Sequence, residues 1–183
     1  VDSILDRIMR GTGCSHMTVY LPTPGSNFRN DIPYPRVYKG GRPPKPSNYN
    51  ATVDYLSSIS TDLITVITVN GIEVDDALGI AQSSAGKRET IICSIDKDLL
   101  MIPGDHYNLV SKELSYVTED QAIKNFWTQM LTGDAVDNIM GIPKIGPVKA
   151  EALLKGVKGD KAQEEIVRSK YQETWPKDWR SLY

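Results

Sequence analysis

The chain has 183 residues, of which 40% are hydrophobic and 24% charged, and a formal net charge of −2. This composition suits a globular protein with one core, or one core and a small subdomain, and excludes disordered and collagen-like classes. No apolar run approaches the roughly 18 residues of a membrane helix. Two Cys and two His leave no disulfide framework and no imidazole-rich metal site. We therefore expect a cytoplasmic protein.

Alternating strand and helix signals fill residues 1–118. An amphipathic helix is predicted first, at residues 1–10, in place of a signal peptide. Short β-branched runs predict strands buried on both faces at 17–21, 63–69 and 90–95. Helices are predicted between them, at 49–59 and 75–83. Residues 107–110 and 115–117 are predicted to form a hairpin or an edge pair. The βαβ order predicts an α/β fold with a mostly parallel, twisted sheet flanked by helices.

Residues 119–183 predict a helical subdomain. Thr118 and Gln121 have the spacing of a capping box, which would open a helix ending near Leu131. No convincing strand follows Gly133. The expected domains are an α/β core at 1–118 and a helical subdomain at 119–183.

Residues 22–48 are rich in Pro, Gly, Asn and basic side chains, too polar for a core. A loop this long inside a compact domain is usually functional or disordered. Its aromatics, Phe28, Tyr34 and Tyr38, alternate with Arg29, Arg36 and Lys39, a composition suited to stacking on bases and contacting phosphates. A second basic stretch covers residues 144–161. Ordinary solvated surface remains an alternative for each.

Seven carboxylates in three short clusters stand out. They are Glu73, Asp75, Asp76, Asp96, Asp98, Asp134 and Asp137. The first two clusters follow predicted strands, and the carboxyl ends of parallel strands are where open α/β sheets place their sites. Helix capping would explain a single acid there, but three within four residues exceed one cap. Asp134 and Asp137 would share a face if helical, and a plain turn is the alternative.

Carboxylates gathered at one point repel each other unless a cation or retained protons offset their charge. Oxygen ligands without a histidine cluster indicate a hard cation, Mg²⁺ or Mn²⁺. Two such ions clamping a phosphodiester is a chemistry that uses many carboxylates.

Residues 141–154 predict a tight turn of small residues followed by a helix with Pro147 in its first turn. Backbone amides there, with Lys144, Gly146 and Lys149, could hold a DNA phosphate without reading sequence. This is the helix-hairpin-helix pattern, predicted at 139–155, with an ordinary helix-turn as the alternative.

These motifs in this order resemble the 5′-nuclease family, which includes flap endonucleases, the 5′-nuclease domain of bacterial DNA polymerase I and phage exonucleases. The matching motifs are 71–76, 94–98, 133–139, 141–154, Asn27-Phe28-Arg29, and Tyr38-Lys39 with Arg42. Within the family, the sequences of these motifs are most similar to those of tailed-phage exonucleases. The resemblance implies a PIN-like fold with a helix-three-turn-helix subdomain, and roles in DNA replication and repair.

The resemblance also implies a mechanism: hydrolysis near DNA 5′ ends with two divalent ions, and K⁺ at the helix-hairpin-helix. The seven carboxylates would hold the ions, with Asp96 central to catalysis. Lys39 and Arg42 would contact the scissile phosphate, Arg29 and Tyr38 would guide the strand, and Lys144, Gly146 and Lys149 would hold the duplex. DNA is the expected partner of a monomer.

Two departures accompany the resemblance. The family's first strand, with a metal-binding Asp, would precede Val1, so we expect the chain to be incomplete at its N-terminus. Residues 20–23 also lack the Asp that often ends the strand before Phe28-Arg29. A non-catalytic DNA-binding module and a PIN-like ribonuclease are the rival interpretations.

Overall fold

The computed structural model describes residues 1–25, 27–32, 36–59 and 61–183. It divides into two compact units. Unit 1 comprises Val1–Asp31 and Pro43–Val117, and unit 2 comprises Ile32–Arg42 and Thr118–Tyr183. The chain therefore passes between them after residues 31, 42 and 117. The sequence placed all of residues 22–48 in the first domain, whereas the structure groups 32–42 with the helical C-terminal part. Tyr34 lies outside the described residues.

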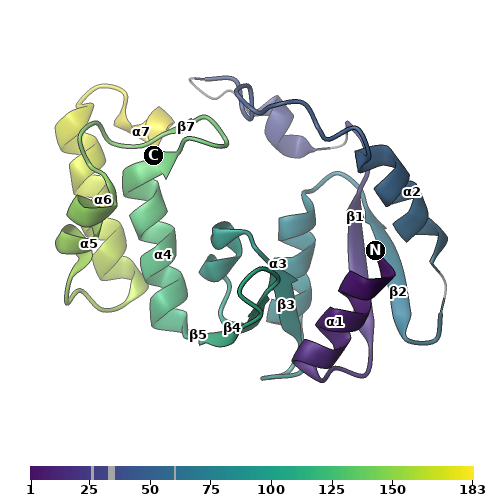
Figure 1. Cartoon of the computed structure of the whole chain (residues 1–183). Helices are drawn as coiled ribbons and strands as arrows, with labels where there is room; N and C mark the ends of the chain where they lie inside the picture. The colour runs from purple at the N-terminus through teal and green to yellow at the C-terminus, as the bar shows by residue number, and fades with distance from the viewer. Residues whose placement is uncertain (26, 33–35, 60) are drawn as a thin grey trace. The chain divides into compact units, whose positions relative to one another are not determined.

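Unit 1 contains the alternating helices and strands that the sequence predicts (Figure 1). Its elements are α1 (Asp2–Thr12), β1 (Met17–Pro22), η1 (Phe28–Asp31), α2 (Tyr49–Ser58), β2 (Ile64–Val69), α3 (Val74–Ser84), β3 (Ile91–Ser94), η2 (Lys97–Met101), β4 (Gly104–Asn108) and β5 (Leu114–Val117). Among the helices that the structure describes, none has both the length and the apolar character needed to cross a membrane.

The strands of unit 1 form two sheets, where the sequence predicts one. β1 pairs in parallel with β2, from Met17 opposite Ile64 to Pro22 opposite Val69. β3 pairs in parallel with β4, and β4 pairs antiparallel with β5. Burial on both faces was also expected of the strand at 63–69, but β2 leaves Ile67 exposed. One face of β2 is therefore only partly covered in the described structure.

A cavity of about 450 Å³ lies between β1 and β3. Side chains of α1 and α3 line it together with those of both strands, including Leu5, Leu78 and Ile92. Cys14 and Cys93 also line it. Burial, with a smaller contribution from Cys14, raises the pKa of the Cys93 thiol to about 11, so this thiol is protonated at neutral pH.

Unit 2 is built on three packed helices, α4 (Glu119–Thr132), α5 (Pro147–Leu154) and α6 (Asp160–Thr174), followed by the short α7 (Trp179–Leu182) (Figure 1). The predicted capping box is confirmed, since Thr118 Oγ1 accepts from Gln121 N at 3.2 Å and Gln121 Oε1 accepts from Thr118 N at 2.9 Å. The buried core consists of Trp127, Leu131, Ile142, Ala150, Leu154, Val167 and Tyr171.

The prediction of no strand after Gly133 is wrong. β6 (Gly133–Asp134) and β7 (Ile139–Met140) form a short antiparallel pair. Two-residue strands are too short to produce a period in the sequence, so pattern alone does not reveal them.

Candidate functional site

The first acidic cluster forms the turn between β2 and α3 in unit 1. Glu73 is the N-cap of α3, and its backbone N–H donates to Asp76 Oδ2 at 3.0 Å, half of a capping box. Asp75 lies in the same first helical turn, half-buried. Acidic groups at a helix N-terminus satisfy free N–H groups and offset the macrodipole. Capping therefore accounts for part of this cluster, as the alternative interpretation held.

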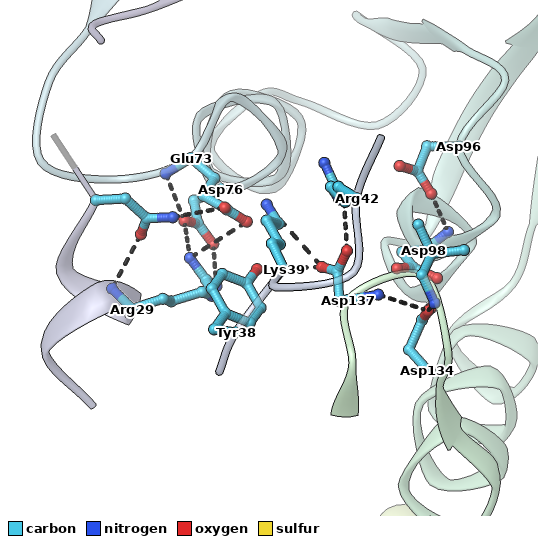
Figure 2. Close-up of polar contacts among 12 residues, drawn as sticks. Arg29, Tyr38, Lys39, Arg42, Glu73, Asp76, Asp96, Asp98, Asp134 and Asp137 are labelled. Atoms are coloured by element: carbon cyan, nitrogen blue, oxygen red, sulfur yellow. Dashed lines mark hydrogen bonds and ion pairs between the residues drawn. The ribbon is translucent and has the colours of Figure 1, made fainter. Parts of the chain in front are cut away.

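Arg29 joins two of these carboxylates. Its guanidinium donates to both oxygens of Asp76, at 2.6 and 2.8 Å, and lies 3.9 Å from Glu73 Oε2 (Figure 2). The side chains are only 16–27% exposed, and a bidentate pair with such low exposure is stronger than a surface ion pair. One cation thus interacts with both Glu73 and Asp76.

Asn27 completes this arrangement. Its Nδ2 donates to Glu73 Oε1 at 2.6 Å, and its Oδ1 accepts from Arg29 N at 2.9 Å. The backbone N–H of Phe28 also donates to Gly71 O at 3.1 Å. These bonds fix the segment that carries Arg29 against the acidic turn. The sequence motif contains Asn27, but no role was predicted for it.

The second cluster directly follows β3. Asp96 is the N-cap of η2, and its Oδ1 accepts from Asp98 N at 2.9 Å. Asp96 is exposed and Asp98 half-buried. Both acidic turns of unit 1 therefore come after the carboxyl ends of strands, as predicted from the sequence.

The third cluster begins at Asp134, the last residue of β6, and continues to Asp137 in the turn before β7, not on a helix, so the turn alternative is the correct one. Asp134 is 4% exposed and accepts from Val136 N at 2.7 Å, Asp137 N at 3.2 Å and Gln129 Nε2 at 3.1 Å. Its carboxylate thereby fixes the loop from inside.

Asp137 collects three side chains from the segment at 36–42. Tyr38 donates from its hydroxyl at 3.1 Å, Lys39 Nζ lies at 3.9 Å, and the Arg42 guanidinium donates to the other carboxylate oxygen (Figure 2). All four residues belong to unit 2. Predicted DNA-contacting residues thus pair with a predicted metal ligand.

Gly133 permits the close approach of the chain on which this loop depends. Its φ of 69° and ψ of −172° lie in a region that is essentially restricted to glycine. A Cβ at this position would meet the backbone of Ile139 and Gly141.

We expect Gly133→Ala to lower the free energy of unfolding of unit 2 by about 2 kcal/mol, from backbone strain and this collision. The matched control is Gly156→Ala, because Gly156 has a φ of 75° and open space around an added Cβ. Urea unfolding followed by tryptophan fluorescence would compare them. Equal losses in the two variants would show that the collision contributes nothing.

Residues 141–154 bring an exposed helix start to the surface of unit 2. Gly146 is the N-cap of α5, Pro147 occupies its first turn, and buried Ile142 anchors the preceding turn in the core. Lys144, Gly146 and Lys149 are exposed. The backbone geometry suits the anion site predicted from the sequence.

Carboxylate oxygens, which the acidic turns offer, are the ligands that hard divalent cations prefer. The ion pairs of Arg29 with Glu73 and Asp76 show only that the first turn attracts positive charge. Among the described residues, however, no three His, Cys, Asp or Glu side chains are placed to hold an ion together. Within unit 1 the positive charge beside Glu73 and Asp76 is that of Arg29. The full ligand set stays a prediction.

Comparison with known proteins identifies the family. The sequence model described as "5'-3' exonuclease, N-terminal resolvase-like domain" matches residues 2–127. The chain is 31% identical over 157 residues to DNA polymerase I of Pseudomonas aeruginosa, covering 79% of the chain and 17% of the polymerase. It is 33% identical over 141 residues to a 5'-3' exonuclease of Buchnera aphidicola subsp. Schizaphis graminum, covering 70% of the chain and 48% of that protein.

Solved structures agree with this at the level of the fold. The T5 D15 protein co-crystallized with metal ions superposes with a TM-score of 0.63 at 13% identity, covering 94% of this chain and 78% of that one. T5 5'-exonuclease with bound zinc gives 0.61 at 14% identity, covering 92% and 74%. The α/β fold is therefore that of a 5′-nuclease. The chain belongs to the 5'-3' exonuclease N-terminal domain family, and it spans half or less of these curated relatives.

Proposed function

We propose that this chain is the nuclease part of a divalent-metal-dependent 5′→3′ DNA exonuclease and structure-specific flap endonuclease, acting in the cytoplasm. The observation that carries the proposal is the pair of acidic turns after β2 and β3 of unit 1. In the first of them, Glu73 and Asp76 share one cationic partner, Arg29. The names of the related exonucleases support it. So do the similar T5 structures, of which one is a co-crystal with metal ions and another a flap endonuclease complex with DNA and metal ions.

The carboxylates are the proposed ligands of Mg²⁺ or Mn²⁺. In unit 1 they are Glu73, Asp75, Asp76, Asp96 and Asp98, and in unit 2 Asp134 and Asp137. The chemistry supplied by a bound pair of ions is activation of water and stabilisation of the leaving oxygen. Arg29, fixed by Asp76 and Asn27, would then orient the acidic turn and contact the strand.

The basic residues of unit 2 are the proposed contacts to DNA phosphates. Lys39 and Arg42 would stabilise negative charge that develops on the scissile phosphate. Tyr38 lies beside them and would guide the strand. Residues 139–155 would act as a helix-hairpin-helix, with K⁺ at the turn and the phosphate held by Gly146, Lys144 and Lys149. Contacts of this kind fix position without reading sequence.

The test is Mg²⁺-dependent cleavage of duplex DNA by the natural protein. A 5′-labelled duplex should release short labelled products with 5′-phosphates, an otherwise identical 3′-labelled duplex should shorten only gradually, and EDTA should stop both reactions. A flapped substrate and an RNA duplex of the same sequence serve as comparisons. DNA binding without cleavage would indicate a non-catalytic module, and faster cleavage of RNA would indicate a ribonuclease; either result would overturn the proposal.

A further inference from the structure

The segment Arg36–Arg42 is attached to the loop Asp134–Asn138 by its backbone as well as by its side chains. Lys39 N donates to Asp137 O at 2.9 Å, and Asn138 Nδ2 donates to Val37 O at 2.9 Å. Partners in these bonds lie about 100 positions apart in the chain, so they depend on the folded unit. We call this set of contacts, centred on Asp137, the clasp.

The two segments adopt special backbone conformations where they meet. Lys39 has a φ of 55° and Asn138 a φ of 59°, both in the left-handed region that non-glycine residues seldom adopt. Turn bonds from Gly40 N to Val37 O and from Arg42 N to Lys39 O hold the basic segment in shape. Such conformations persist where surrounding contacts enforce them, and the clasp provides those contacts.

The loop Asp134–Asn138 is the more buried and more hydrogen-bonded of the two segments at its acidic side chains. Asp134 is nearly fully buried and accepts three hydrogen bonds, two from backbone N–H groups of the loop itself. The side chain of Asp137 is 15% exposed, whereas those of Lys39 and Arg42 are 25% and 45% exposed. A shielded carboxylate thus holds two more exposed cations, which places Asp137 at the centre of the interaction.

The charge of Asp137 also helps to hold the basic segment in place. Two cationic side chains held near one point repel each other, and the Asp137 carboxylate offsets that repulsion. Without it, the segment would lose its side-chain anchor and keep the repulsion. We propose that Asp137, besides its proposed part in metal binding, is a positioning residue, which holds Lys39 and Arg42 in place for the DNA phosphate. This inference rests on the proposed function for the role of the two basic residues.

Limited proteolysis without metal tests the positioning directly. Trypsin can cut the Lys39–Gly40 bond when the segment leaves the loop, and cleavage tracks the population of the open form. We expect Asp137→Asn to speed cutting there about tenfold in EDTA, with no change at Lys170. The matched control is Glu151→Gln, which removes a carboxylate 3.5 Å from Lys124 in the same unit. Equal rates at Lys39 in wild type and Asp137→Asn would overturn the inference.

Kinetics separate positioning from metal binding. If Asp137 acts through Arg42, then Asp137→Asn and Arg42→Gln should each lower kcat, and the double variant should lose much less than the product of the two losses. The deficit of Asp137→Asn should also persist at tenfold higher Mg²⁺. If the kcat losses of the two single variants multiplied in the double variant, or if Mg²⁺ fully rescued Asp137→Asn, Asp137 would be a metal ligand alone and the inference would be overturned. A wild-type protein that cleaves no DNA would refute the proposed function instead, leaving the proteolysis result intact.

Discussion

Asp96→Asn is expected to lower the rate of DNA cleavage by about 10³-fold, because the loss of this proposed metal ligand would remove roughly 4 kcal/mol of transition-state stabilisation. Asparagine retains an oxygen that can accept the bond from Asp98 N, so the N-cap of η2 should survive. The substitution therefore removes charge without removing the local structure. Single-turnover cleavage of a 5′-labelled duplex measures the rate, and fluorescence anisotropy in Ca²⁺ measures DNA affinity.

The control for this substitution is Asp62→Asn, which makes the same change of charge at an exposed position of unit 1. Its cleavage rate should stay within about twofold of wild type, as for a surface site remote from the chemistry. Cleavage by Asp96→Asn at the rate of this control would remove Asp96 from the mechanism. If Asp96→Asn lowered DNA affinity and cleavage rate by the same factor, the substitution would act on DNA binding and not on the chemical step.

Leu131→Ala should lower the free energy of unfolding of unit 2 by about 4 kcal/mol, since it removes a fully buried side chain and leaves a cavity. Leu131 has 0% exposure and lies in the cluster with Ile142 and Val167. Its carbonyl also accepts from Ile142 N at 2.9 Å, so the helix and the following turn meet at this residue. If neighbouring side chains moved into the cavity, both the helix α4 and the turn at Ile142 would shift.

Tryptophan fluorescence isolates this transition, because all three tryptophans of the chain lie in unit 2. Val148→Ala is the matched control: it also truncates an aliphatic side chain, but one that is 83% exposed. Its stability should change by less than about 0.5 kcal/mol. A loss below about 1 kcal/mol for Leu131→Ala would mean that the core repacks around the gap.

Local chemistry made several parts of this structure predictable. Thr118 and Gln121 are three residues apart, and that spacing alone predicts a capping box. The acids after β2 and β3 were predicted to lie at the ends of strands because β-branched runs precede them directly. In both cases the forces act within a few residues, so the sequence contains them.

Other features depend on contacts that no short pattern encodes. The pairing of Asp137 with Lys39 and Arg42 joins positions nearly 100 residues apart, and each residue alone suggested a different partner: metal for the acid and phosphate for the bases. Asn27 was overlooked because an amide beside an arginine is unremarkable until Glu73 is brought next to it. The separation of the strands into two sheets likewise depends on which strands pair, and no short pattern encodes that.

The three passages of the chain between the units affect how the protein can assemble during synthesis. Residues 36–42 leave the ribosome long before the loop at 134–138 that they bind. At typical rates of 5–20 residues per second, about 100 residues correspond to a wait on the order of 10 s. Unit 1 can begin to fold in that time with a basic loop still open. Closing the clasp is then a late step of biogenesis.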